Sequence, residues 1–451
     1  MRALLAFESR QLLASRMAQL CLAVLALMLA IAMANGRALL DGQIATRAAA
    51  AAEANEARTK LAEQVAKELP PAEAVLLPVR VREGLVSAVP PLADVAAGRA
   101  ATEPAAASIS LRSRADNLFR RPSLENAERL MRGSLDLAFV AVVVAPLLLI
   151  ALGHGLFSAD RDSGAARLVL AQAGGLGPLL LARSVPRLSL VILPILLALL
   201  LLLLTGPDLP GRSAAAVSWV GIGMALLAAW WGAILWVNSR DVGADTAALV
   251  LVSAWALFTL VLPVLVAASV QWQHPAPSRL AEVAAVRAAE IAASTEWEND
   301  HPEVAASEAA ERRASVARAA GISARVEAAV APVSARFAEA LTAQQQASSA
   351  LAWAVPPLLA SRAMADTGGT GLAGALAFRV EAVAHLARFK AALGAIIAGD
   401  GVVTPERLAT MPQFRPPMPT RSAIPATLWL AALAALFAGM AARNFARVQL
   451  A

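Results

Sequence analysis

Residues 179–204 read LLLARSVPRLSLVILPILLALLLLLL. A helix that crosses the ~30 Å hydrocarbon core of a bilayer needs about 20 predominantly apolar residues. This run exceeds that length, and Pro194 inside it is tolerated when neighbouring groups satisfy the backbone carbonyl that it frees. The stretch therefore predicts a membrane-spanning helix.

The composition of the whole chain agrees with this reading. Hydrophobic residues make up 58% of the 451 residues and charged residues only 16%, against roughly 45–50% and ~25% in soluble domains. Five further apolar windows are long enough to span a bilayer, near 17–34, 135–156, 214–237, 247–270 and 424–442. We therefore expect an all-α membrane protein with six transmembrane helices.

The spacing of these windows leaves two large polar insertions, 35–134 and 271–423, and only short connections elsewhere. Excess Arg and Lys mark the cytoplasmic side of short loops. Four predicted inner parts are the segment 1–16, the segment 157–178 together with the start of the third window up to Arg187, the short connection after residue 237, and the segment 443–451. They hold ten basic and five acidic residues: Arg2, Arg10, Arg16, Arg161, Arg167, Arg183, Arg187, Arg240, Arg443 and Arg447 against Glu8, Asp160, Asp162, Asp241 and Asp245. Both termini are expected inside, and both insertions outside as extracytoplasmic domains.

The insertions themselves are nearly neutral. They hold 14 basic and 12 acidic residues in the first, and 14 of each in the second. The net charge of +6 is thus mainly an orientation signal, and no basic stripe with interleaved aromatics predicts a nucleic-acid partner. The single cysteine, Cys21, lies in the first apolar window, so no intramolecular disulfide is expected.

Most of the two insertions is predicted to be helical. Residues 44–69 and 278–350 are rich in Ala, Glu and Arg, a composition typical of solvated helices. In the second stretch we expect breaks at His301-Pro302, Gly321 and Pro332. Alternating valines within 70–123 predict short strands there: Val79, Val81, Val86 and Val89.

A charged stretch lies between the second and third windows: Phe157-Ser-Ala-Asp-Arg-Asp-Ser-Gly164, followed by Leu179-Leu-Leu-Ala-Arg-Ser-Val-Pro-Arg187. It resembles the cytoplasmic coupling segment of type-2 ABC transporter permeases. The resemblance implies that Phe157 anchors this segment in a groove of a separate ATPase and that Asp160 and Arg161 form charge pairs across that interface. Gly164 is the glycine that follows the acid–base pair in the family's coupling segment. The family usually has Glu where this chain has Asp160. A solvated, inside-positive loop is the alternative.

The first residues have two readings. Glu8, Arg10 and Arg16 resemble the elbow helix that lies along the inner membrane surface in the same family. The apolar run that ends in Ala32-Met33-Ala34 is also compatible with a cleaved signal peptide.

Three outer stretches resemble a subfamily of these permeases that has two large periplasmic insertions: Val355–Gly369, Leu386–Lys390 and Met411–Arg415. Their Pro-Pro and Gly-Gly pairs also punctuate helices in any fold. The resemblance follows the order of elements along the whole chain, but its motifs are short and do not identify a cargo.

The resemblance implies a permease subunit of an ATP-driven transporter in a bacterial inner membrane, which moves an amphipathic or hydrophobic substrate with a second permease and a pair of ATPases. ATP and Mg²⁺ would bind on those ATPases. None of the lysines, Lys60, Lys67 and Lys390, follows a glycine as a P-loop requires, and the histidines lack metal-ligand spacing. We expect neither a cofactor nor an enzymatic site in this chain. The rival hypothesis is a membrane scaffold or sensor whose outer domains bind a partner.

Overall fold

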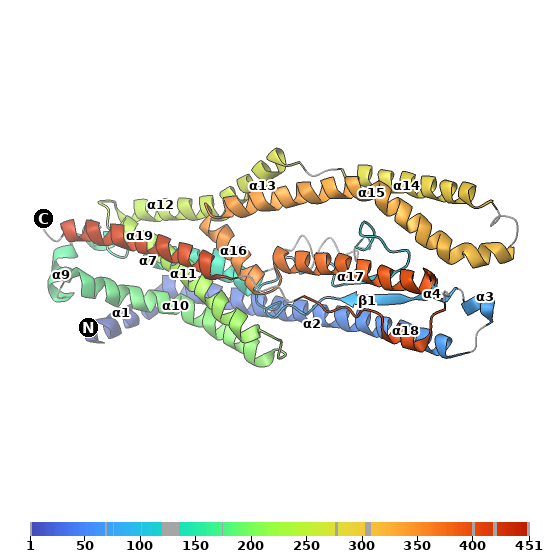
Figure 1. Ribbon diagram of the computed structural model, residues 1–451. Coiled ribbons are helices and arrows are strands. Elements are labelled where there is room, and N and C mark those ends of the chain that lie inside the picture. The colour runs from blue at the N-terminus through green and yellow to red at the C-terminus, as the bar shows by residue number, and fades with distance from the viewer. Residues whose placement is uncertain are drawn as a thin grey trace.

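The computed structural model describes residues 2–67, 70–74, 76–100, 102–119, 135–173, 175–275, 278–302, 308–398, 402–417 and 422–448. The molecule is elongated and mostly helical, and both chain ends lie at the same end of it (Figure 1). Within the described residues, six helices are long and apolar enough to cross a membrane. The protein is therefore a multi-pass membrane protein, as the apolar windows predict.

The six candidate spans form a bundle at the end that carries both termini, which we call the terminal end (Figure 1). A short helix, α1 (Arg2–Ala14), precedes them. The spans are α2 (Arg16–Ala66), α6–η1–α7 (Leu137–Phe139, Val140–Val144 and Ala145–Gly153), α10 (Leu176–Thr205), α11 (Arg212–Asn238), α12–η2–α13 (Ala244–Ala256, Leu257–Val261 and Leu262–Gln273) and α19 (Ile424–Val448). As expected, α10 continues through Pro194.

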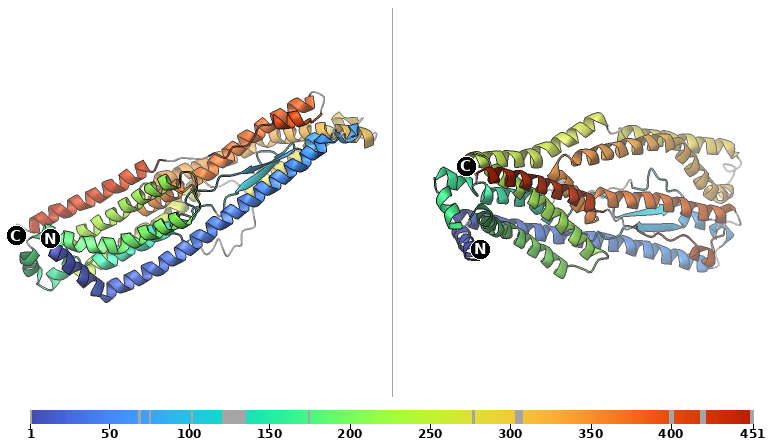
Figure 2. Two further views of the ribbon diagram at one scale, coloured as in Figure 1. Left: turned by 90° about the horizontal axis from the view of Figure 1, so that it is seen from below. Right: turned by 60° about the vertical axis from the view of Figure 1, so that its left-hand side comes forward.

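The first span is much longer than a bilayer requires. The two helical stretches expected near 17–34 and 44–69 are one helix, α2, of 51 residues, which corresponds to a length of about 75 Å. Figure 2 shows α2 in blue, running from the bundle to the far end of the molecule. This helix joins the membrane part to the outer part, which we call the extension.

Two spans contain a π-helical turn just before a proline. The turn η1 ends at Val144, before Pro146, and η2 ends at Val261, before Pro263. Proline lacks the N–H of a regular helical turn and its ring clashes with the preceding turn, so a wider turn accommodates it. In η1 the carbonyl of Val143 accepts a hydrogen bond from the indole of Trp255 at 3.0 Å, so a neighbouring span satisfies this backbone group.

The extension is built from helices around a small sheet. Its elements are α3 (Pro71–Ala74), α4 (Leu77–Arg80), β1 (Arg82–Val86), β2 (Ala106–Ser110), α14 (Arg279–Asp300), α15 (Glu308–Ala352), α16 (Pro356–Thr367), α17 (Leu372–Ala398) and α18 (Pro405–Ala409). The strands pair antiparallel, with Gly84 opposite Ser108. They confirm that short strands lie within 70–123, but of the four valines on which the prediction was based only Val86 lies in a strand, and Val79 lies in α4. A Cβ on Gly84 would lie 2.4 Å from that of Ala54, so the sheet packs directly on α2.

The expected break at His301-Pro302 is confirmed, since α14 ends at Asp300. Breaks at Gly321 and Pro332 are wrong, because α15 runs through both. A Cβ at Gly321 would lie 2.4 Å from the Trp297 ring, so this glycine makes room for an aromatic side chain of α14. Near Pro332, buried Val326 and Val330 belong to an apolar cluster with α14 that supports the helix.

Besides the cluster between α14 and α15, three larger apolar clusters hold the described parts of the protein together. The largest lies within the bundle, and a second fills the extension around Leu85, Ile109 and Phe389. The third lies at the terminal end. In the bundle, α19 packs closely on α11, where a Cβ on Gly232 would meet Phe437 at 3.0 Å. This is the close helix contact that small residues permit in membranes.

Candidate functional site

The coupling segment lies at the terminal end and forms two short helices, α8 (Ser158–Asp162) and α9 (Ala166–Ala173), between α7 and α10. Gly164 separates them with a φ of 74°, a conformation that favours glycine. The segment expected at 157–178 overlaps the first residues of α10, which begins at Leu176. Helices α8 and α9 therefore form a compact bend between α7 and α10, which we call the corner.

An ion-pair network fixes this corner to α10 and α1. Arg183 of α10 donates to the carboxylate of Asp160 and to the carbonyl of Leu156, the latter at 2.7 Å. Its Nε also donates to Glu8 of α1 at 3.0 Å. The Arg183 guanidinium thus joins Glu8 and Asp160, two acids that are far apart in the sequence. The sequence predictions had placed them in separate elements, the elbow helix and the coupling segment.

A second arginine completes the network. Arg187, one helical turn after Arg183, donates to the carbonyl of Leu152 at 2.9 Å and lies 3.7 Å from Glu8. Glu8 is only 5% exposed. The other predicted elbow residues, Arg10 and Arg16, are exposed on α1 and α2. Of the three elbow residues, it is Glu8 that the structure brings to the coupling segment.

The amide of Asn238, at the end of α11, holds the start of α8. Its Oδ1 accepts hydrogen bonds from the backbone N–H groups of Phe157 and Ser158, at 3.1 and 3.3 Å, and its Nδ2 donates to the carbonyl of Gly153 at 3.0 Å. Arg161 donates to the carbonyl of Asn238 at 3.2 Å. Sequence analysis missed Asn238; its signal was a polar amide at the end of an apolar run.

Phe157 lies inside the protein, not on its surface. Its side chain is 1% exposed and packs edge-on against Phe445 of α19, with ring centroids 5.7 Å apart. Leu176, Leu179 and Ala441 complete the cluster. The expectation of a free anchor for a partner is therefore wrong for this residue. The ring instead fills the space between the coupling segment, α10 and α19.

The surface of the corner is made by other residues. Leu168 of α9 is 64% exposed, although its neighbours Val169 and Leu170 pack against the Phe157 cluster. Gly164 and Asp162 are exposed, and Asp162 accepts a hydrogen bond from the Ala244 N–H at the start of α12 at 2.7 Å. Among the side chains that the structure describes here, Leu168 is thus a large apolar one exposed on a firmly held surface.

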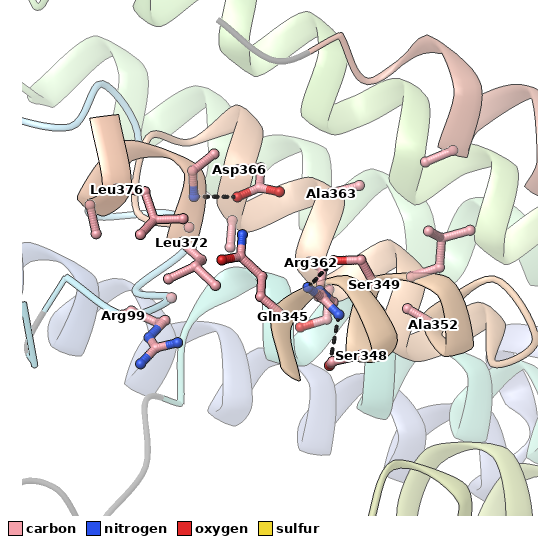
Figure 3. Close-up of a pocket in the computed structure, with 18 of the residues that line it drawn as sticks. Arg99, Gln345, Ser348, Ser349, Ala352, Arg362, Ala363, Asp366, Leu372 and Leu376 are labelled. Carbon is pink, nitrogen blue, oxygen red and sulfur yellow. Dashed lines mark hydrogen bonds between the residues drawn. The ribbon is translucent and has the colours of Figure 1, made fainter. Parts of the chain in front are cut away.

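A second feature lies at the other end of the bundle. An open cavity of about 850 Å³ is lined by α15, α16 and α17 together with the first turn of α19. Figure 3 shows Arg362 of α16 between Ser348 and Ser349 of α15, whose hydroxyls accept its hydrogen bonds at 3.0 and 2.8 Å. These contacts fix the guanidinium in the wall of the cavity.

Further charged groups line the same cavity. Glu103 accepts a hydrogen bond from Arg379 at 2.9 Å and lies 3.6 Å from Arg99. Asp366 accepts a hydrogen bond from the backbone N–H of Ala373, at the start of α17. The stretch Val355–Gly369, singled out above for its resemblance, contains Asp366, but no sequence pattern linked it to Glu103, Arg99 and Arg379, which come from the first insertion and α17.

Fold and sites together define a multi-pass helical membrane protein with a large extension beyond the candidate spans. Residues 283–417 match the family described as Domain of unknown function (DUF3526). The match covers most of α14 and the whole of α15–α18, and it includes the α15–α17 wall of the cavity. No curated protein and no solved structure matches the chain.

Proposed function

We propose that this chain is the permease subunit of an ATP-driven ABC transporter, energised by a separate ATPase that docks on the coupling segment. The observation that carries the proposal is the helical corner α8–α9, which projects between two spans, is bonded to α10 and α11, and is joined to α1 through Arg183 of α10. The excess of basic residues at this end supports a cytoplasmic location.

The bonds at the corner give a route by which movement of a docked ATPase reaches the membrane. A displacement of α8 pulls on α10 through the Asp160–Arg183 pair, and on α11 through Asn238. Phe157 transmits the same displacement to α19 through Phe445. Because packed interfaces move as units, the corner acts as a rigid lever.

Leu168 takes the anchoring role that the family resemblance implied for Phe157. It is the large apolar side chain of α9 that the rest of the protein leaves exposed. A protruding apolar residue held by well-packed neighbours is what an interface hot spot needs, since little ordering entropy is lost on binding.

The assembly follows from the family resemblance. Two permeases, identical or related, would work with two ATPases, and ATP hydrolysis would move an amphipathic or hydrophobic substrate or drive the extension mechanically. The alternative is a scaffold or sensor, in which the spans only anchor the extension. In that case no ATPase docks at the corner.

Site-specific photo-crosslinking in native membranes tests the proposal. A photoreactive amino acid in place of Leu168 should crosslink to a protein that carries a P-loop. The matched control is Leu280 of α14, which is 78% exposed but lies in the extension. Capture of no P-loop protein from position 168, or equal capture from position 280, would favour the scaffold.

A further inference from the structure

The cavity of about 850 Å³ lies at the level where the candidate spans join the extension. Its wall includes Val270 near the end of α13 and Ala426 in the first turn of α19, together with the helices of the extension. Exposed tryptophan rings surround this level: Trp272, Trp353 and Trp429. Since tryptophan gathers at membrane–water interfaces, the cavity lies at the boundary between lipid and water.

The lining combines two kinds of surface. Apolar side chains from several helices contribute one part, namely Val270, Leu341, Leu359, Leu372 and Leu376. The polar part comes from the loop before β2, the last turns of α15, and α16, and Figure 3 shows Arg99, Gln345 and Arg362 among its residues. A cavity with both surfaces suits a molecule with an apolar body and a polar head. Its volume lies within the range of about 300–1,000 Å³ usual for ligand pockets.

The charges favour an anionic head. The lining holds three arginines, Arg99, Arg362 and Arg379, against two acids, Glu103 and Asp366, which leaves one positive charge in excess. Glu103 lies between two of the guanidinium groups. Arg362 is held by two serine hydroxyls, which orient its guanidinium. A positioned guanidinium forms strong paired hydrogen bonds with a carboxylate or phosphate.

We propose that this cavity binds an anionic amphiphile: a molecule with an acyl chain and a carboxylate or phosphate head. The chain lies against the leucines, and the head contacts Arg362. Gln344 and Gln345, which also line the cavity, supply further hydrogen-bond donors. The site goes beyond the proposed ATPase coupling, because binding is a property of this chain alone and is measured without a partner.

Binding of radiolabelled oleate to the purified, delipidated chain in a nonionic maltoside detergent tests this inference. Unlabelled oleate and oleyl phosphate should compete. Oleyl alcohol, which lacks the charge, should compete at least about tenfold less well, as expected for the loss of a charge-assisted hydrogen bond. Acetate and inorganic phosphate, which lack the chain, should not compete.

Two substitutions locate the site. Arg362→Gln should weaken oleate binding by about tenfold or more, by the same reasoning. Leu376→Glu places a carboxylate on the apolar wall and should also weaken it. The matched control is Arg388→Gln, which removes an exposed arginine of α17 that pairs with Glu381 outside the cavity.

Three results would overturn the inference. Equal competition by oleyl alcohol and oleate would show a merely apolar surface. Competition by inorganic phosphate or acetate at similar concentrations would show a site for free anions. Unchanged binding in both Arg362→Gln and Leu376→Glu, each with the thermal stability of the unsubstituted protein, would place the bound oleate elsewhere.

Discussion

The carboxylate of Glu8 in α1 lies 3.0 Å from Nε of Arg183 in α10. The same guanidinium holds Asp160 of α8. A helix that precedes the first span is thereby joined to the corner between the second and third spans. Because Glu8 and Arg183 are mostly shielded from solvent, their attraction is screened less than that of a surface pair, and α1 becomes part of the site.

Replacing Arg183 with methionine should destabilise the protein, since Glu8 and Asp160 then lose their shared partner. Removing one member of a buried pair typically costs about 3–5 kcal/mol, and Arg187, which stays 3.7 Å from Glu8, should reduce this cost. Unfolding in detergent measures the effect. Adding Glu8→Gln should recover part of the loss. Arg388→Met, at an exposed pair, is the control; a loss there as large as at Arg183 would contradict the network.

Phe157→Ala should cost about 3–5 kcal/mol, because it leaves a cavity where a buried aromatic ring packs on Phe445. Phe157→Leu should cost much less, as it retains most of the volume. Thermal unfolding separates the two. If Phe157→Ala unfolds like the unsubstituted protein yet loses its ATPase partner, the ring acts at the surface and the buried assignment is wrong.

Gly36 and Gly42 lie in the same helix, α2, but differ in the space beside them, so their substitutions can be compared. A Cβ at Gly36 would lie 1.9 Å from the carbonyl oxygen of Asp94, whereas nothing lies within 4 Å of one at Gly42. Gly36→Ala should therefore lower the melting temperature and disturb the buried Asp94–Arg212 ion pair, in which the closest atoms are 2.6 Å apart. Gly42→Ala should raise stability by up to about 1 kcal/mol through helix propensity. Equal melting temperatures would show that α2 does not touch this loop.

The charge asymmetry predicts which end of the bundle faces the cytoplasm. With Cys21→Ser as background, Lys60→Cys in the outer part of α2 should react with a membrane-impermeant maleimide in intact cells. Ser163→Cys, at the exposed turn after α8, should react only after lysis. The opposite pattern would reverse the orientation and remove the coupling segment from the side where ATP is available.

The six spans and the helical insertions follow from apolar runs and composition, which depend on neighbouring residues in the sequence. The site depends on contacts that such patterns do not encode. Arg183 is 175 residues from Glu8, and the arginines of α10 have the same local pattern whether they face lipid headgroups or bind acids.

Burial was the other property that local sequence did not determine. Phe157 begins a charged stretch, which is typical of an exposed position, yet its ring belongs to a cluster completed by Phe445 near the other end of the chain. Gly321 has the pattern of a helix break, but α15 continues through it, and the absence of a side chain there makes room for the ring of Trp297.

ATP hydrolysis by the complex that copurifies with this chain tests the permease assignment most directly. The preparation from native membranes should contain an ABC-type ATPase and hydrolyse ATP. The Leu168 side chain is exposed, so Leu168→Asp should not disturb the fold. This substitution should reduce both the amount of ATPase recovered and the rate of ATP hydrolysis. Leu280→Asp should leave both unchanged. Hydrolysis by the homogeneous chain alone, or identical recovery from Leu168→Asp and Leu280→Asp, would contradict the assignment.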